Sequence, residues 1–524
     1  MGIDARARRL VLAAAAMGLS LSPALAQDAP MSAIDWLSQS VTAAPQAASL
    51  PAGPSPDAVE EPEVTTGAVP ADVAVTVLGA PAPDAVGLLS SDRSGLPRNL
   101  WGLGATEEIA AAISADRADI LPTLQSLMVT LLLAEAEAPP DAGGRGILLL
   151  ARIDRLLAMG ALDQAAALIE ATNSVTVDLF RRQFDVALLT GTEDRACETM
   201  RTAPNLAPTF PARIFCLARA GDWTAAALTL RTAQALGQID RQEEELLSRF
   251  LDPEAYDGEA PLLPPSRPTP LIWRLYDAIG ETLPTTSLPV AFANAELTDR
   301  AGWKAQIEAA ERLTRAGALT PNTLLGVYTE RLPAASGGVW DRVEAFQRFD
   351  TALRAADPGA VARTLPDAWA RMEEAELETA FAGLFAEDLI RLPLTGETAA
   401  LAFRIALLSP HYERAANTHK PSDLTETFLA GLARGQLQGI TPPDSMARAI
   451  APAFLRPAPP PEAEALLAES RLGETILLAI DRIGNGVRGD LRGVSEGLSI
   501  LRHIGLEDAA RRTALELLLL ERRG

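Results

Sequence analysis

Two cysteines are the side chains in this sequence whose spacing best predicts a covalent bond. Cys197 and Cys216 are the only cysteines in the chain. They lie at equal sequence distances from the middle of a proline-rich loop expected over residues 202–211, so an antiparallel helical hairpin would place them opposite each other. A disulfide there would contribute about 3 kcal/mol. We predict that disulfide; two buried thiols and a redox pair are the alternatives, and no Cys-x-x-Cys sequence supports the redox pair.

The histidines have spacing that does not favour metal binding or acid–base catalysis. His411 and His419 would lie about 80° apart around a helix, with Glu413 as the carboxylate between them, and His503 is remote in sequence. Zinc ligands on a helix are usually i,i+4 pairs or more numerous. The chain also lacks a Gly-x-Ser-x-Gly elbow and a phosphate-binding Lys-Ser/Thr loop. We therefore predict capping or exposed histidines, no catalytic residue, no metal site and no cofactor.

One dipeptide resembles a known catalytic motif. Glu469-Ser470 is similar to the Glu-Ser pair of lytic transglycosylase domains, which are carried by helical periplasmic superhelices. The pair is expected inside an amphipathic helix, however, and the Gly-Leu-Met-Gln stretch of that family does not follow it. The sequence therefore does not predict this activity.

The first 26 residues have the three-part layout of a secretory signal peptide. Arg6 to Arg9 form a basic start, residues 10–21 are apolar, and Ala24-Leu25-Ala26 forms a small-residue cleavage site. The apolar run is shorter than the roughly 20 residues that a membrane-spanning helix needs. We expect export and cleavage after Ala26, with the periplasm as the predicted location and secretion as the alternative.

An Ala/Pro-rich acidic segment follows, over residues 27–98, and is predicted to be a disordered tether. Two short stretches, one inside this segment and one at its C-terminal end, contain large apolar side chains. These could dock on another protein, or they could anchor the segment on the chain's own surface. The docking candidates are Ile34, Trp36, Leu37, Leu96 and Trp101.

Helical repeats are indicated downstream. Gly160, Gly191 and Gly221 are 31 and 30 residues apart, and each ends an apolar stripe of helical spacing. Glycine is the usual residue after a helix C-terminus, so each is expected to end one helix of a hairpin. A small residue follows each glycine by five positions, where it would allow close helix packing: Ala165, Ala196 and Ala226. The turns resemble those of tetratricopeptide (TPR) repeats, which implies a TPR-like solenoid.

Composition agrees with an all-α fold. Alanine and leucine dominate the apolar residues, and aromatic residues are only 5% of the chain. The net charge of −22 opposes binding to nucleic acid or to anionic membrane surfaces. The predicted organisation is a signal peptide (1–26), a tether (27–98), an N-terminal helical-repeat block (99–252), a Pro-rich linker (253–270), a second helical block (271–451) and a C-terminal helical region (452–524). The proline-rich breaks could be inter-domain linkers or long turns within one superhelix.

The signal, the early Ile34-Asp35-Trp36-Leu37-Ser38, the Gly-Leu-Pro island at 95–97 and the helical body together resemble a family of exported bacterial proteins. Some members are labelled antifreeze glycopeptide polyprotein, but tandem Ala-Ala-Thr units are absent here, so no activity follows from the label. The leading hypothesis is a non-enzymatic periplasmic scaffold or adaptor that binds a protein or peptide. The alternatives are a peptidoglycan-related envelope enzyme whose active site is not visible as a motif, and a structural envelope component.

Overall fold

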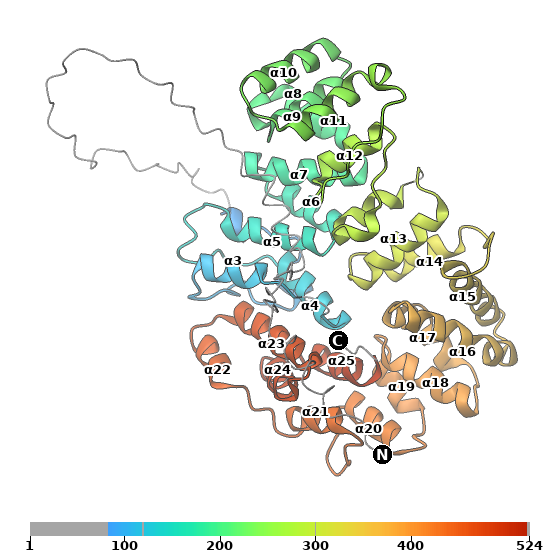
Figure 1. Ribbon diagram of the computed structural model, residues 1–524. Coiled ribbons are helices and arrows are strands. Elements are labelled where there is room, and N and C mark those ends of the chain that lie inside the picture. Colours follow the sequence, from blue (N-terminus) through green and yellow to red (C-terminus); the bar gives the residue numbers. More distant parts are fainter. Residues whose placement is uncertain (1–81, 118–119, 299, 521–524) are drawn as a thin grey trace, which may run out of the picture. The chain divides into compact units, whose positions relative to one another are not determined.

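The computed structural model describes residues 82–117, 120–298 and 300–520, and in this part the chain is all-α (Figure 1). No β-strand occurs in these ranges, although an isolated parallel bridge pairs Leu89 with Ala134. None of the helices described is long and apolar enough to cross a membrane. The predicted signal peptide, residues 27–81 of the predicted tether, and the candidates Ile34, Trp36 and Leu37 lie outside these ranges.

Helical hairpins form where the glycine repeat predicts them. The three glycines have φ values of 77°, 73° and 81°, the left-handed conformation that favours glycine after a helix. Each lies between two packed helices, and the alanine five positions later is buried. The hairpins are α5 (Ile147–Ala158) with α6 (Leu162–Ala171), α7 (Val177–Thr190) with α8 (Glu193–Thr202), and α9 (Phe210–Arg219) with α10 (Trp223–Ala235).

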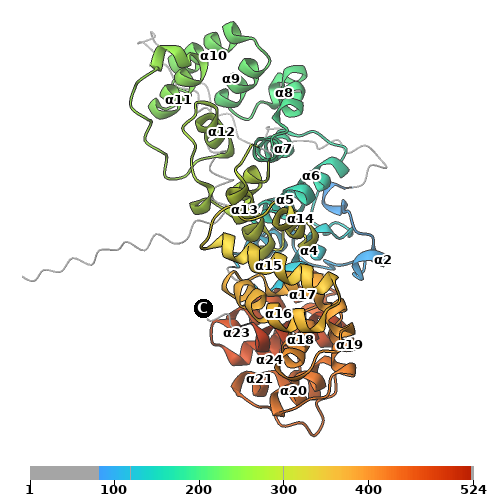
Figure 2. The same cartoon turned by 90° about the vertical axis from the view of Figure 1, so that its right-hand side faces the viewer.

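The predicted disulfide is confirmed. Cys197 in α8 and Cys216 in α9 are bonded, with their Cα atoms 5.0 Å apart. The loop between these helices contains the short turn η3 (Pro204–Leu206). Both sulfur-bearing residues are buried in the apolar cluster shared by α7 to α12, whose later members α8 to α12 are seen together in Figure 2.

The Pro-rich segment 253–270 is a long turn in this structure. It follows α11 (Arg241–Leu251), begins with η4 (Pro253–Tyr256) and leads into α12 (Pro270–Ala278). The Tyr276 hydroxyl donates to the Leu263 carbonyl at 2.8 Å, and the Leu262 amide donates to Glu281 at 2.7 Å. Helix α12 then packs on α7 and α11, so the chain on both sides of the prolines shares one apolar cluster.

The remaining helices continue the all-α arrangement. Before α5 come η2 (Pro83–Ala85), α2 (Ser91–Ser94), α3 (Thr106–Ser114) and α4 (Pro122–Leu133). After α12 come η5 (Thr285–Ser287), η6 (Val290–Leu297), α13 (Trp303–Arg315), α14 (Pro321–Thr329), α15 (Val339–Arg354), α16 (Pro358–Glu374), α17 (Glu378–Arg391), α18 (Gly396–Leu407), α19 (Tyr412–Thr418), α20 (Leu424–Ala433), α21 (Ser445–Leu455), α22 (Pro461–Ala468), α23 (Leu472–Val487), α24 (Leu491–His503) and α25 (Glu507–Leu519).

Residues 82–98 are part of this packed structure, although the sequence assigned them to the tether. Asp84 is fully buried and accepts hydrogen bonds from the amides of Gly146 and Leu149, at 3.2 and 2.9 Å, at the start of α5. The buried Arg152 guanidinium donates to the Val86 carbonyl at 2.7 Å. A buried carboxylate at a helix N-terminus satisfies amides that have no partner within the helix. The packed body therefore begins before residue 99.

The first and last helices of this body pack on each other. Helix α3 contacts α23, and α4 contacts α25 (Figure 1). The Thr123 hydroxyl donates to the Glu516 carboxylate at 2.6 Å, and the Arg117 guanidinium pairs with Asp481 at 2.6 Å. Repeats of a linear solenoid contact only their neighbours. These contacts between remote segments are not a feature of a linear solenoid, and the hairpins of α5–α10 do not by themselves establish the predicted TPR-like solenoid.

Candidate functional site

The structure buries two of the predicted docking residues. Leu96 is 3% exposed and Trp101 is 2% exposed. The Trp101 ring lies against Gly473 so closely that a Cβ atom on that glycine would be 2.4 Å from it. The Gly473 amide also donates to the Leu100 carbonyl at 2.8 Å. Leu96 and Trp101 thus anchor their segment on the chain itself, which is the other role that the sequence left open.

The histidines are placed at helix ends. His419 follows α19, stacks on Phe403 with ring centroids 4.0 Å apart, and has its Nε2 atom 2.9 Å from Glu426. His411 precedes the same helix and is partly exposed. Within the described ranges, no group of three or more His, Cys, Asp or Glu residues could hold a metal ion.

The Glu469-Ser470 pair lies in a turn, where the sequence had placed it inside a helix. Ser470 has φ 58° and separates α22 from α23. Glu469 forms an ion pair with Arg471 at 3.0 Å, and its carbonyl accepts from the Leu103 amide at 3.2 Å. The expected continuous helix is broken at the left-handed Ser470, and the resulting turn carries part of the contact with the N-terminal segment.

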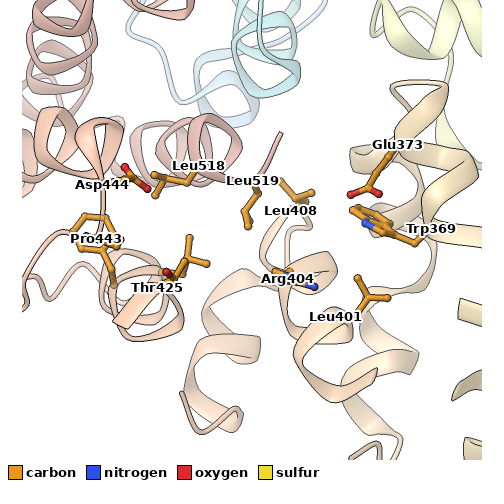
Figure 3. A pocket seen from close by; sticks show the side chains of 12 residues that line it. Trp369, Glu373, Leu401, Arg404, Leu408, Thr425, Pro443, Asp444, Leu518 and Leu519 are labelled. Atoms are coloured by element: carbon orange, nitrogen blue, oxygen red, sulfur yellow. The ribbon is translucent and has the colours of Figure 1, made fainter. Parts of the chain in front are cut away.

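A cleft of about 380 Å³ lies among the helices of the last third of the chain; we call it the C-terminal cleft. Figure 3 shows Trp369 and Leu401 on one side and Thr425 and Pro443 on the other, with Leu519 between them. The walls come from α16, α18, α20, α25 and the loop before α21. The lining residues are Trp369, Glu373, Leu401, Arg404, Leu408, Thr425, Phe428, Leu429, Pro443, Asp444, Leu518 and Leu519.

The C-terminal cleft is lined by polar as well as apolar side chains, including Glu373, Arg404, Thr425 and Asp444. Arg404 is exposed in the last turn of α18 and forms no ion pair within the ranges described. The Asp444 carboxylate accepts from the Ala447 amide at 2.8 Å and thereby caps α21. Glu373 also interacts with another group, so its carboxylate is not free. The cleft therefore combines apolar side chains with two carboxylates that already have interactions and one guanidinium that forms no ion pair among the described residues, so Arg404 is the charged group left to bind a ligand acceptor.

A second cavity, of about 210 Å³, lies between the hairpin helices; we call it the repeat cavity. It is bounded by α7, α9, α11 and α12 and by the loops before α9 and α12. The lining residues are Arg181, Phe184, Asp185, Pro208, Thr209, Phe210, Pro211, Ala212, Gln238, Glu243, Leu246, Thr269, Leu271, Ile272 and Leu275.

Asp185 is the unusual side chain of the repeat cavity. It is 8% exposed, and its Oδ2 atom is buried without a hydrogen-bond partner among the described residues. Burial raises its pKa from 3.8 to about 7, against the opposing effect of Arg181 and Arg182. Arg182 donates hydrogen bonds to both oxygens of Asp154, at 2.5 and 2.6 Å, so its positive charge is largely neutralised by Asp154.

Neither cavity was predicted from the sequence. Each is lined by side chains from helices far apart in the chain, which periodicity does not bring together. A partial signal existed for Asp185, because it is the acidic residue in the otherwise apolar stretch Phe184–Leu189. An acid on the apolar stripe of a helix must be buried, capped or paired, and only the fold decides which.

Comparison with protein-family models, curated proteins and solved structures finds no match for this chain.

Proposed function

We propose that this protein is a non-enzymatic, periplasmic helical-repeat scaffold that binds a peptide or protein partner in the C-terminal cleft. The observation that carries the proposal is the lining of that cleft. Trp369, Phe428 and five leucines surround a volume of about 380 Å³, within the usual size of a ligand site. Aromatic anchors and arginine are the residues most often responsible for affinity at protein interfaces.

The partner segment that fits this lining has apolar side chains and a carboxylate. The apolar groups would fill the space between Trp369 and Leu519, and the carboxylate would pair with Arg404. Arginine suits this role because its planar guanidinium can bind both oxygens of a carboxylate at once. The disulfide between α8 and α9 is compatible with the oxidising compartment that export would give.

A photocrosslinking experiment in cells would test the proposal. A photoreactive phenylalanine analogue is placed at Leu401 in the cleft, and in a control at Leu228, which is exposed on α10. We expect a discrete adduct from position 401 and none from 228. The experiment is repeated on a chain that lacks residues 27–81, a deletion that leaves Asp84 and the packed body intact. An adduct that depends on 27–81 would assign docking to that segment and contradict the cleft.

A charge reversal tests the carboxylate. Arg404→Glu should reduce partner recovery about fivefold or more, because an ion pair becomes a repulsion. Arg348→Glu is the matched control, since Arg348 is likewise exposed on a helix, α15, and forms no ion pair within the described ranges. Equal recovery with both variants would argue against a carboxylate at Arg404.

A further inference from the structure

We propose that the repeat cavity is a second binding site, which takes a primary amine on a short apolar stem, such as a lysine side chain of a partner. This site is separate from the C-terminal cleft, and the inference does not rest on the proposed function. It rests on an unpartnered buried carboxylate oxygen, on the size and lining of the cavity, and on the balance of charge around it.

The Oδ2 atom of Asp185 needs a hydrogen-bond donor. A buried acceptor without a partner has lost its hydration and gained nothing in return, which is unfavourable for any carboxylate and more so for an ionised one. Asp185 lines the cavity, but its Oδ2 atom is itself shielded from solvent, so an ammonium group in the cavity would bond this oxygen only after a small movement of the side chain. An ammonium group supplies both donors and the opposite charge.

The cavity has room for a side chain and little more. Its volume of about 210 Å³ is below the roughly 300–1,000 Å³ of sites that hold whole small-molecule ligands. Apolar groups of Phe184, Leu246, Leu271 and Leu275 form much of the wall. Such a wall favours the methylene groups of an alkyl stem, whose burial contributes about 0.8 kcal/mol per CH₂.

The charges in the cavity favour a cation over an anion. Asp185 and Glu243 are both present, and burial raises the pKa of Glu243 as well. Arg181 is the basic residue of the lining, and it already has an interaction partner and a charge interaction with Asp185. A ligand anion would therefore meet two carboxyl groups and a guanidinium that is already engaged.

Two helix N-termini also line the cavity, and alone they would favour an anion. Each is capped by its own side chain. Thr209 accepts from the Ala212 amide at the start of α9, and Thr269 accepts from the Ile272 amide at the start of α12, both at 3.2 Å. These caps reduce the attraction of the helix ends for a ligand anion, whereas the Oδ2 atom of Asp185 still lacks a hydrogen-bond donor among the described residues.

The amine must come from outside this chain's own packed surface. The sequence has two lysines; Lys304 pairs with Glu308 at 3.3 Å, and Lys420 lies beside α20. The net charge of −22 provides a long-range attraction for cationic partners. A lysine-bearing segment of another protein is therefore the occupant that the chemistry favours.

Binding of small probes to the mature chain tests this proposal. Butylamine, 1-butanol and butanoate are titrated at pH 8 while the methyl signals of Ile272 and Leu271 are followed by NMR. We expect saturable chemical-shift changes with butylamine, and we expect 1-butanol and butanoate to bind at least tenfold more weakly. Asp185→Asn should weaken the binding of butylamine at least tenfold. Asp178→Asn should leave this binding unchanged, because Asp178 is an exposed acid on the same helix.

A second readout needs no variant. The amine stabilises the ionised carboxylate, so its affinity should fall about tenfold or more between pH 8 and pH 5.5, as Asp185 takes up a proton. The charged groups that act on Asp185 are Arg181 and Arg182 on its own helix and Asp154 on α5, with Glu243 across the cavity. Equal binding of butanol, tighter binding of butanoate, or affinity that does not change with pH would each overturn the proposal.

Discussion

Replacing Asp185 with asparagine should change how the stability of this protein depends on pH. Burial raises the pKa of Asp185 from 3.8 to about 7, so the folded protein holds this proton more tightly than the unfolded chain does. Stability is therefore lost as the pH rises through the window from about 4 to about 7, and the loss is complete above it. Asparagine has nearly the same shape and does not ionise, so the variant lacks this loss.

The size of the stability difference follows from the pKa shift of Asp185. Three pH units at about 1.4 kcal/mol each give roughly 4 kcal/mol as an upper limit. The measured difference should be smaller, because Arg181 loses a partner charge in the variant. Only about two of these pH units lie between pH 5 and the folded pKa, so we expect Asp185→Asn to gain about 1–3 kcal/mol relative to the natural chain between pH 5 and pH 8.

Urea unfolding followed by circular dichroism at pH 5 and pH 8 measures this difference. Comparing the two proteins at each pH cancels the titration of the groups they share. Asp178→Asn on the same helix serves as the control and should run parallel to the natural chain, because Asp178 is exposed. If Asp185→Asn also ran parallel at both pH values, Asp185 would have an ordinary pKa, and the reasoning about its burial would be refuted.

Two further variants, a double cysteine replacement and a glycine replacement, test other parts of the fold. Replacing Cys197 and Cys216 with serine should lower the free energy of unfolding by about 3 kcal/mol, measured by urea titration with the natural chain under reductant as a comparison; an unchanged midpoint would show that the bond adds nothing. Gly473→Ala should cost about 1–3 kcal/mol through its clash with Trp101. The control Gly484→Ala, in the same helix with open space around it, should be neutral or stabilising, and similar losses in both would contradict the role of Trp101.

Sequence reasoning succeeded where the determinants are local. The signals for a helix end, a glycine and the apolar stripe before it, lie within one or two helical turns of sequence. The hairpins around Gly160, Gly191 and Gly221 could therefore be predicted. The disulfide was predicted from the loop that joins two successive hairpins, because symmetry about that short loop fixes which residues of α8 and α9 are opposite each other.

The candidate sites depend on contacts that no local pattern encodes. Trp101 could be recognised as a side chain that needs a partner, but nothing near it indicates that the partner is Gly473. The same holds for the C-terminal cleft, where Trp369 and Leu519 line one space only after several helices have packed. Asp185 shows the other limit, because its residue type was visible and its burial was not.

The packing of the first helices on the last has a consequence for how the chain folds. Synthesis delivers α3 and α4 long before α23 and α25, so Trp101 and Thr123 cannot reach Gly473 and Glu516 until almost the whole chain is available. Contacts of such high sequence separation slow folding and prolong the exposure of apolar surface. A short truncation at the C-terminus should accordingly harm the N-terminal helices more than the hairpins between them.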